Sequence, residues 1–573
     1  METLNNYILL VDSYFGSAAW FPLLLLSVGI FFTAYLGVPQ FKYFSKGWKI
    51  LFSSGKGNEG QTSPFQALST ALSGTVGTGN IGGVAMAIFI GGPAALFWMW
   101  ITAFLGMTTK FVEVSLSHAY REKNKSGEIS GGPMVYMEKG LNMKWLGVIF
   151  AFSLLISTFG SGNMPQIDNI SSTIESSFGI DPLMTSLVMS LLVALVIIGG
   201  IKRISTIAAS IVPLMAFIYL IGGLSVLIFN YENIIPSFQI IILDVFEGTS
   251  VVGGFLGASF SLAFTYGVAR GLYSNEAGQG SAPIAHATSR TKHSVEEGFV
   301  SILEPFIDTI IICTLTGLVI LSSGVWTEKF TNSFERTSMY VVNGNLDEKK
   351  DGKDILNFLS GENSSLKNFS GDLNIISGKI QNSVTILNNR SIAEEVTVNK
   401  NGVPFTGKIR INNSELDGNF EFVGKSLVKS AVLTSKAFNK GFFGSYGEYI
   451  VSIGLLLFAF STVITWAYYG DRCSAYLFGE SSIIYYRILY IFAFFIAGSG
   501  YIDTEIIWNF ALITVAASTL PNLISIFLLR NEMKILISSY NKNLMTDVVI
   551  IGGGVIGLSI AREFLNLEKK LLF

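Results

Sequence analysis

Charged residues are scarce in this sequence. Only 14% of its 573 residues are Asp, Glu, Lys or Arg, whereas an average soluble domain carries about 25%. Half of the chain is hydrophobic, and its mean hydropathy is +0.52. This composition excludes an ordinary soluble globular protein and disorder over most of the length. It predicts an all-α polytopic membrane protein in contact with the lipid bilayer.

Cysteine and histidine are also rare, with two and three residues respectively. So few ligands exclude a disulfide framework and a Cys/His metal cluster. The 38 basic and 40 acidic residues leave a net charge of only −2, so no basic excess indicates a nucleic-acid partner. We therefore expect no bound cofactor and no nucleic acid.

Long apolar stretches are abundant. A spanning helix needs about 20 mostly apolar residues, and the sequence contains eleven such stretches. They lie near 17–38, 65–90, 95–118, 145–165, 183–201, 207–229, 250–272, 299–322, 446–469, 484–500 and 505–530. The first is not expected to be a cleaved signal peptide, because Met1–Phe15 contains no Lys or Arg.

The loops between these stretches alternate in charge. Those near 39–64 and 119–144 are rich in Lys and Arg, whereas the short loops 166–182 and 230–249 contain neither. Because positive loops stay on the cytoplasmic side, we expect the N-terminus outside and the C-terminus in the cytoplasm. The sequence thus predicts a multi-pass protein of the cell inner (plasma) membrane.

Residues 327–445 are polar and interrupt the apolar pattern between the eighth and ninth stretches. Alternating segments at 406–412 and 419–424 indicate strands. We expect a small β-rich extracytoplasmic insert, and a solvated decoration is the favoured interpretation. The alternative is a receptor or channel that uses the insert as its ligand module.

The segment 545–573 also does not belong to the pattern of apolar spans. Gly552, Gly554 and Gly557 form a G-x-G-x-x-G after an apolar strand, which resembles the opening of FAD-dependent oxidoreductases. A membrane-associated FAD-linked oxidoreductase is therefore an alternative function. The second strand with its acidic ribose ligand is missing, so we expect a truncated dinucleotide-fold-like fragment, an artefact of fusion to a neighbouring reading frame.

Glycine crowds the second apolar stretch. The residues are Gly74, Gly77, Gly79, Gly82 and Gly83. One interpretation is close helix packing. The other is an interrupted helix, whose free N–H groups hold a carboxylate and whose free C=O groups hold a cation. Because Thr78 and Asn80 add polar side chains among these glycines, the sequence favours a break from Val76 to Asn80.

The seventh stretch carries another glycine cluster, formed by Gly253, Gly254, Gly257, Gly267 and Gly271. Two glycine-interrupted spans, five apart in order, indicate an inverted-repeat transporter. The predicted units are a peripheral first span with its loop (1–64), a first repeat (65–230), the start of a second repeat (250–326), the insert (327–445) and the end of the second repeat (446–530).

Polar side chains recur in the fourth and ninth stretches. Asn163 and Gln166 are three residues apart, so both can face one side of a helix. Ser461 and Thr462 are adjacent hydroxyls, which either bond back to their own helix or supply oxygen ligands to a monovalent cation. Trp466 lies one turn further on and is placed to wall a small pocket.

These segments resemble the alanine or glycine:cation symporter family. The matching motifs are residues 73–85, 160–166, 266–287 and 458–472, and the likeness runs over about 15–325 and 440–530. The resemblance implies a leucine-transporter-like fold of five-plus-five inverted repeats with one additional span. It also implies the import of alanine or glycine, usually with Na⁺.

The resemblance implies site residues as well. Thr78 and Gly79 would meet the substrate carboxylate, Asn163 and Gln166 would contact the substrate, and Trp466 would close the pocket. Sodium would be held by backbone carbonyls near Gly74 and Gly77, with Ser461 and Thr462. Alanine or glycine and Na⁺ or H⁺ stay open, and the long insert and Pro165 depart from the family pattern.

Other ionisable residues have simpler expected roles. We expect Lys110 to pair with Glu113 on the third span. Asp308 is expected to make a buried structural hydrogen bond, with a proton or cation role as the alternative. His118, His286 and His293 lie at predicted cytoplasmic ends and are expected to be solvated.

Overall fold

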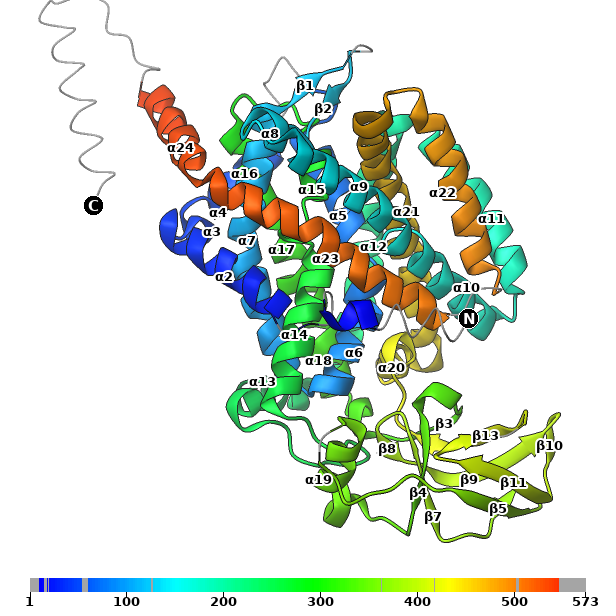
Figure 1. The fold of residues 1–573 in the computed structure, drawn as a ribbon. Coiled ribbons are helices and arrows are strands. Elements are labelled where there is room, and N and C mark those ends of the chain that lie inside the picture. Colours follow the sequence, from blue (N-terminus) through cyan, green and yellow to red (C-terminus); the bar gives the residue numbers. More distant parts are fainter. Residues whose placement is uncertain are drawn as a thin grey trace, which may run out of the picture.

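The computed structural model describes residues 10–14, 18, 20–53, 60–124, 127–361, 363–416, 418–500 and 504–545. The predicted dinucleotide-like fragment, 545–573, therefore lies outside the described residues except for Met545. Figure 1 shows a large helical body with a β-rich unit at one end.

The first half of the helical body runs from α2 to α13. Its helices are α2 (Trp20–Tyr35), α3 (Pro39–Lys42), α4 (Phe44–Leu51), α5 (Pro64–Thr75), the π-helix η1 (Gly79–Gly83), α6 (Val84–Gly91), α7 (Ala94–Tyr120), α8 (Pro133–Lys139), α9 (Lys144–Gly160), α10 (Met164–Phe178), α11 (Pro182–Ile197), α12 (Gly200–Phe229), η2 (Tyr231–Asn233) and α13 (Ile234–Glu247). A short hairpin, β1 (Glu122–Lys123) with β2 (Ile129–Ser130), follows α7.

The second half surrounds the insert in sequence. Its helices are α14 (Phe260–Asn275), α15 (Ala282–His286), α16 (Ser294–Ser301), α17 (Leu303–Pro305), the π-helix η3 (Phe306–Cys313), α18 (Thr314–Ser322), η4 (Val325–Thr327), η6 (Gly444–Tyr446), α21 (Gly447–Phe478), α22 (Ser482–Gly498), α23 (Thr504–Leu528) and α24 (Arg530–Met545).

Several of these helices are long and apolar enough to cross a membrane. Among the described residues, five qualify by length and composition, or seven if each of two bent pairs counts as one span. The shorter helices α2, α11 and α22 are also apolar. Each of the eleven predicted stretches overlaps a helix, but eleven as a number of spans remains a prediction.

Large apolar side chains cover the outside of the helical body. Leu195 on α11, Phe217 and Ile228 on α12 and Phe246 on α13 are all at least 62% exposed. A soluble protein rarely exposes many large apolar side chains together, whereas lipid is a favourable surrounding for them. The exposed surface therefore agrees with a polytopic membrane protein.

The seventh predicted span is wrong at its start. Helix α14 begins at Phe260 rather than near 250, and Gly253 and Gly257 lie before it with φ of +56° and +97°. Glycine adopts this left-handed region at little cost, so these residues form an irregular approach to the helix. Only Gly267 and Gly271 of the cluster lie within α14, where they face α7.

The β-rich unit is built from the polar insert, as predicted. Its strands are β3 (Phe330–Ser333), β4 (Met339–Asn343), β5 (Gly371–Ile376), β6 (Lys379–Ile380), β7 (Val384–Asn388), β8 (Ser391–Ile392), β9 (Glu394–Lys400), β10 (Val403–Pro404), β11 (Gly407–Asn412), β12 (Glu415–Leu416) and β13 (Glu421–Ser426). They form sheets in the orders β10-β9-β13-β3, β12-β11-β5-β6 and β4-β7-β8. Helix α19 (Glu348–Leu359) accompanies them.

The insert has its own apolar core and a firm connection to the helical body. Leu373, Ile409 and Phe422 are buried between its strands. Its first and last strands, β3 and β13, pair antiparallel with Ser426 opposite Phe330. Helix α20 (Ser430–Phe438) follows and packs on η1, where Thr434 Oγ1 donates to the Ile81 carbonyl at 3.1 Å.

The close contact of α14 with α7 yields a test. A Cβ at Gly267 would lie 2.4 Å from the Ala95 carbonyl oxygen, which is backbone and cannot rotate away. We expect Gly267→Ala to destabilise the protein by about 1–3 kcal/mol through overpacking. Thermal unfolding of the purified protein measures the change.

The matched control is Gly454→Ala in α21. There the nearest atom to a new Cβ is Tyr219 Cδ2 at 3.6 Å, an ordinary contact. This variant should keep its unfolding temperature or gain about 0.5–1 kcal/mol, since alanine favours a helix over glycine. Equal destabilisation of both variants would contradict the close approach of α14 and α7.

Candidate functional site

The helix that begins at Pro64 is interrupted. Ser63 opens it with a capping box, in which Ser63 Oγ accepts from the Gln66 N–H and Gln66 Oε1 accepts from the Ser63 N–H. Helix α5 ends at Thr75, Val76 is extended with ψ of 92°, and the axis bends by 55° before η1 and α6. The predicted break between Val76 and Asn80 is confirmed.

A second break follows α14. Residues 276–281 are not helical, and φ is positive at Glu276 (+52°), Gly278 (+90°) and Gly280 (+80°) before α15 resumes. The sequence pattern indicated an interruption within the seventh stretch, whose glycine cluster runs from Gly253 to Gly271 and so lies upstream of this break. The two glycines of the actual break supply the backbone geometry that residues with a Cβ rarely adopt.

The two breaks share a small polar cavity. Its volume is about 10 Å³, room for roughly one water molecule. It is lined by Gly74, Thr75, Gly77, Thr78, Gly79, Ser161, Gln166, Tyr273, Glu276, Thr462 and Trp466. Seven of the nine predicted site residues are therefore gathered at one place, and only Asn163 and Ser461 are missing from the lining.

Two polar atoms at this cavity lack partners. Thr78 Oγ1 and Gln166 Oε1 are buried and accept or donate no hydrogen bond within the described part of the chain. The amide nitrogen of Gln166 donates to the Ser161 carbonyl at 3.1 Å, which fixes the direction of the side chain. Buried polar atoms are normally satisfied, so these two atoms mark a place for a polar ligand.

Asn163 is oriented differently from Gln166. Its Nδ2 donates to the Tyr490 carbonyl at 2.8 Å, so the side chain points toward α22. Asn163 is the N-cap residue of α10, and Pro165 lies in the first turn of that helix. The helix boundary thus separates two side chains that an uninterrupted helix would place on one face.

The hydroxyls of α21 reach the interrupted helix. Thr462 Oγ1 donates to the Phe458 carbonyl of the same helix at 3.0 Å and lies 3.5 Å from the Val76 carbonyl oxygen. Ser461 Oγ donates to the Phe458 carbonyl at 2.9 Å and lies 3.4 Å from the Ser73 carbonyl oxygen. Both therefore bond back to their helix while standing beside carbonyls at the end of α5.

A carboxylate that sequence reasoning missed completes the cavity. Glu276 is only 4% exposed, and its Oε2 accepts from Ser281 Oγ at 2.5 Å. Trp466 Nε1 lies 3.2 Å from Glu276 Oε1 and 3.3 Å from the Gly74 carbonyl, so the indole joins the two breaks. Glu276 lies beyond the end of the predicted seventh span, close to Gly278 and Gly280. A carboxylate among glycines next to a span was the sequence signal that could have identified it as a site residue.

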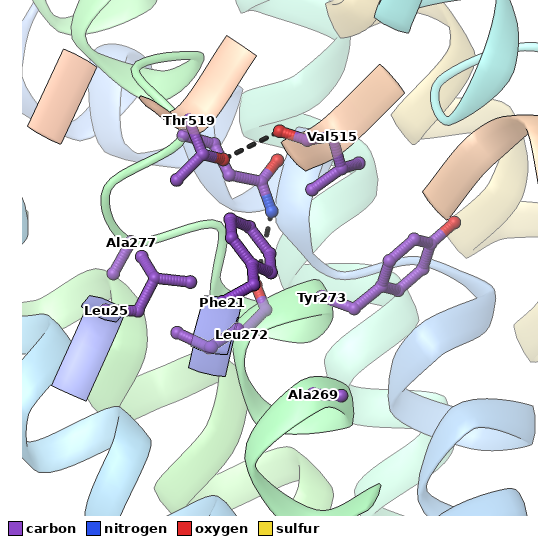
Figure 2. Close-up of a pocket in the computed structure, with 9 residues that line it drawn as sticks. Phe21, Leu25, Ala269, Leu272, Tyr273, Ala277, Val515 and Thr519 are labelled. Carbon is purple, nitrogen blue, oxygen red and sulfur yellow. Dashed lines mark hydrogen bonds between the residues drawn. The ribbon is translucent and has the colours of Figure 1, made fainter. Parts of the chain in front are cut away.

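An apolar side cavity adjoins the second break. It has a volume of about 30 Å³ and is bounded by α2, α14 and α23. Figure 2 shows Phe21 and Leu25 close to Ala277, with Tyr273 pointing away from them. Tyr273 lines both cavities, so its ring separates the apolar space from the polar one.

Asp308 stabilises the first break through hydrogen bonds. Its carboxylate accepts from Asn80 Nδ2 at 2.6 Å, Ser274 Oγ at 2.7 Å and Thr309 Oγ1 at 2.7 Å. Asn80 Oδ1 in turn accepts from the Gly77 N–H at 2.9 Å. The predicted buried structural hydrogen bond of Asp308 is confirmed, and it connects the π-helices η3 and η1.

A buried ion-pair network surrounds Lys110 of α7. Lys110 Nζ pairs with Glu304 Oε1 at 3.0 Å, and His286 lies between Glu297 Oε1 at 2.6 Å and Glu304 Oε2 at 3.6 Å. All four side chains are fully buried.

Two expectations about these groups are wrong. Lys110 pairs with Glu304 of α17 rather than with Glu113, whose carboxylate instead accepts from Asn522 Nδ2 at 2.8 Å. His118 and His286 are 5% and 0% exposed rather than solvated. These predicted helix ends are buried because α15 and α16 pack against α7. Hydropathy does not reveal this packing.

Comparison with known proteins decides the family. The sequence model of the sodium:alanine symporter family matches residues 1–347 and 418–549. The chain belongs to the sodium:alanine symporter family. It is therefore a multi-pass amino acid:cation symporter and not an enzyme, which removes the basis of the oxidoreductase alternative.

Individual relatives agree with this family. The chain is 36% identical over 533 residues to the sodium/alanine symporter AgcS of Methanococcus maripaludis, covering 91% of this chain and 95% of that protein. It is 35% identical over 532 residues to an uncharacterized transporter of Haemophilus influenzae (92% and 94% covered). The probable sodium/glutamine symporter GlnT of Bacillus subtilis is 39% identical over 304 residues (53% and 63%).

The ion-pair network of this symporter yields a prediction. Lys110→Met would leave Glu304 without its ammonium partner at a site that is 0% exposed. We expect a loss of about 3–5 kcal/mol of stability, measured by thermal unfolding in detergent. A second variant, Lys110→Met with Glu304→Gln, should recover part of the loss because the uncompensated charge is gone.

Lys144→Met provides the control. Lys144 Nζ lies 3.4 Å from Glu138 Oε1, but the lysine side chain is 73% exposed. Surface pairs of this kind contribute about 0–1 kcal/mol, so little change is expected. A stable Lys110→Met protein would show that the network does not depend on the lysine charge.

Proposed function

We propose that this chain imports a small neutral amino acid, alanine or glycine, together with Na⁺ by alternating access. The observation that carries the proposal is the small polar cavity between two interrupted helices, with Thr78 Oγ1 and Gln166 Oε1 unpartnered within the described part of the chain. Membrane transporters of this architecture bind substrate and coupling ion where helices unwind near the middle of the bilayer.

The substrate carboxylate docks at the start of η1. Residues Thr78 and Gly79 stand at the N-terminal end of the second half of the interrupted helix, where the first N–H groups of a helix have no intrahelical acceptor and the helix dipole is positive. Gln166 adds its amide from α10, and Asn163 supports this region through its bond to the Tyr490 carbonyl. Trp466 closes the side of the cavity.

Glu276 receives the substrate ammonium group. It contributes the one carboxylate among the cavity-lining residues, and an amino acid is a zwitterion whose positive end needs a negative partner in a low-dielectric site. With the carboxylate held at Thr78 and Gly79, the ammonium group faces the other break. The cavity as it stands has room for roughly one water molecule, so the two breaks must move apart during alternating access before both ends of a short amino acid are satisfied there.

Sodium occupies the junction of α5 and α21. Carbonyl oxygens near Gly74 and Gly77 and the hydroxyls of Ser461 and Thr462 offer oxygen ligands without a net charge, which suits a hard monovalent cation. The end of α5 adds the negative end of a helix dipole. Binding of the ion at this junction would hold the break in the shape that accepts the substrate carboxylate.

The transporter has eleven spans in this proposal. Spans two to six and seven to eleven form inverted repeats, and α2 is peripheral. The N-terminus is outside, the C-terminus is cytoplasmic and the insert is extracytoplasmic, as the positive-inside rule predicts. Each Na⁺ entering across about 100 mV then supplies ~2.3 kcal/mol, enough for roughly fifty-fold accumulation before any sodium gradient is added.

Thr462→Val tests the cation site together with the function. Valine keeps the shape of threonine and removes the oxygen, so we expect about a tenfold higher Na⁺ concentration for half-maximal uptake. The measurement is uptake of labelled alanine, and of labelled glycine, into proteoliposomes with and without an imposed Na⁺ or H⁺ gradient.

Ser452→Ala is the matched control, because it removes a hydroxyl from the same helix at a position that does not line the cavity, where it bonds to Ser177 Oγ and the Glu448 carbonyl. Its Na⁺ dependence should be that of the unchanged protein. Uptake that ignores Na⁺ but follows an imposed H⁺ gradient would contradict the sodium coupling, and no uptake of either amino acid would contradict the substrate class.

Trp466→Phe tests the size limit of the substrate. The indole is 1% exposed, and a smaller ring would enlarge the cavity, so we expect leucine uptake relative to alanine to rise about tenfold. Competition by unlabelled leucine measures the ratio. Trp100→Phe, which alters a tryptophan bonded to Thr314 Oγ1 away from the cavity, should leave the ratio unchanged; an equal rise there would refute the role of Trp466.

A further inference from the structure

A basic pocket lies at the end of the helical body away from the insert. It has a volume of about 380 Å³ and is lined by Tyr35, Leu36, Lys42, Tyr43, Lys534, Ile537, Ser538, Asn541 and Lys542. It shares no lining residue with the cavity between the two breaks. Ligand pockets commonly have volumes of about 300–1,000 Å³.

The pocket exists because the chain turns sharply after α23. The axis bends by 59° between 513–528 and 530–542, so α24 leaves the direction of α23, and Figure 1 shows it at the opposite end of the body from the insert. On α24, Met533 and Tyr540 are buried. Lys534, Ser538 and Lys542 recur every four residues and therefore share the face that lines the pocket.

The lining is positive and rich in donors. Three of its nine residues are lysines and none is acidic. Lys534 Nζ lies 3.9 Å from the ring centroid of Tyr35, and Lys42 Nζ lies 5.2 Å from that of Tyr43. Within the parts of the chain that the structure describes, these two ammonium groups contact aromatic rings and form no ion pair with a carboxylate.

Large apolar side chains flank these lysines. Phe41, next to Lys42, is 78% exposed, and Ile535, next to Lys534, is 60% exposed. A lysine with an exposed apolar neighbour is typical of the boundary between hydrocarbon and headgroups, where the stem lies in the apolar layer and the ammonium group in the polar one. A soluble anion has no acyl chain that could contact these apolar side chains.

We propose that this pocket binds the phosphate-bearing headgroup of an anionic phospholipid. The lysine ammonium groups pair with the phosphate, Ser538 and Asn541 offer hydrogen bonds to the headgroup alcohol, and the acyl chains lie against Phe41 and Ile535. Basic pockets between transmembrane helices on the cytoplasmic side are suited to this chemistry. The site does not depend on the proposed substrate or coupling ion.

The test is a lipid titration of the full-length protein in detergent. The probes are phosphatidylglycerol, phosphatidylcholine, inorganic phosphate and glycerol phosphate, and the readouts are bound lipid by native mass spectrometry and the shift of the unfolding temperature. We expect phosphatidylglycerol to bind and stabilise, with little effect of the other three. Lys42→Gln with Lys534→Gln should weaken this binding by roughly fivefold for each lysine.

Lys49→Gln with Lys202→Gln is the matched control. It removes the same charge from two exposed lysines that do not line the pocket, so it should keep phosphatidylglycerol binding. Equal losses in both double variants would reduce the effect to general surface charge and overturn the proposal. Equal binding of phosphatidylcholine, or equal stabilisation by inorganic phosphate, would overturn it too. Unfolding temperatures without lipid show that both variants are folded.

Discussion

The buried side-chain amide of Asn80 carries the constraint on which the interrupted helix depends. Unwinding a helix leaves peptide groups without partners, and inside a membrane each of them needs one. Asn80 Oδ1 accepts from the Gly77 N–H, its Nδ2 donates to Asp308, and its carbonyl accepts from Thr316 Oγ1 at 2.8 Å. These bonds hold η1 against η3 and α18, so α5 cannot simply continue into α6. The polar cavity follows from that interruption.

Composition and local pattern were sufficient to predict much of this arrangement. Glycines mixed with Thr78 and Asn80 are poor for an unbroken helix, and the break lies where that mixture is densest. Alternation in the insert located β11 and β13 to within two residues. These signals are local, because each depends on the residues next to it in the chain.

The features that were missed depend on contacts between distant segments. Glu276 lies beyond a predicted span end, and the residues next to it in the chain do not show that it is buried. It is buried because two breaks meet there. His286 is likewise enclosed by Glu297 and Glu304, which follow it by 11 and 18 residues. A hydropathy average does not reveal that partnership, because it reports the mean character of a segment and not which side chains meet. The glycines before α14 have the composition of a break, but here they form an entry loop.

The pairing of β3 with β13 explains how a family member can carry so large an additional unit. The family match is interrupted between residues 347 and 418, within the stretch that these two strands enclose. Because β3 and β13 lie side by side, both ends of the insert connect to the helical body at one place. The entropy of closing a loop grows only with the logarithm of its length. The chain between β3 and β13 can therefore become longer or shorter, or be exchanged, during evolution while the membrane part folds as before.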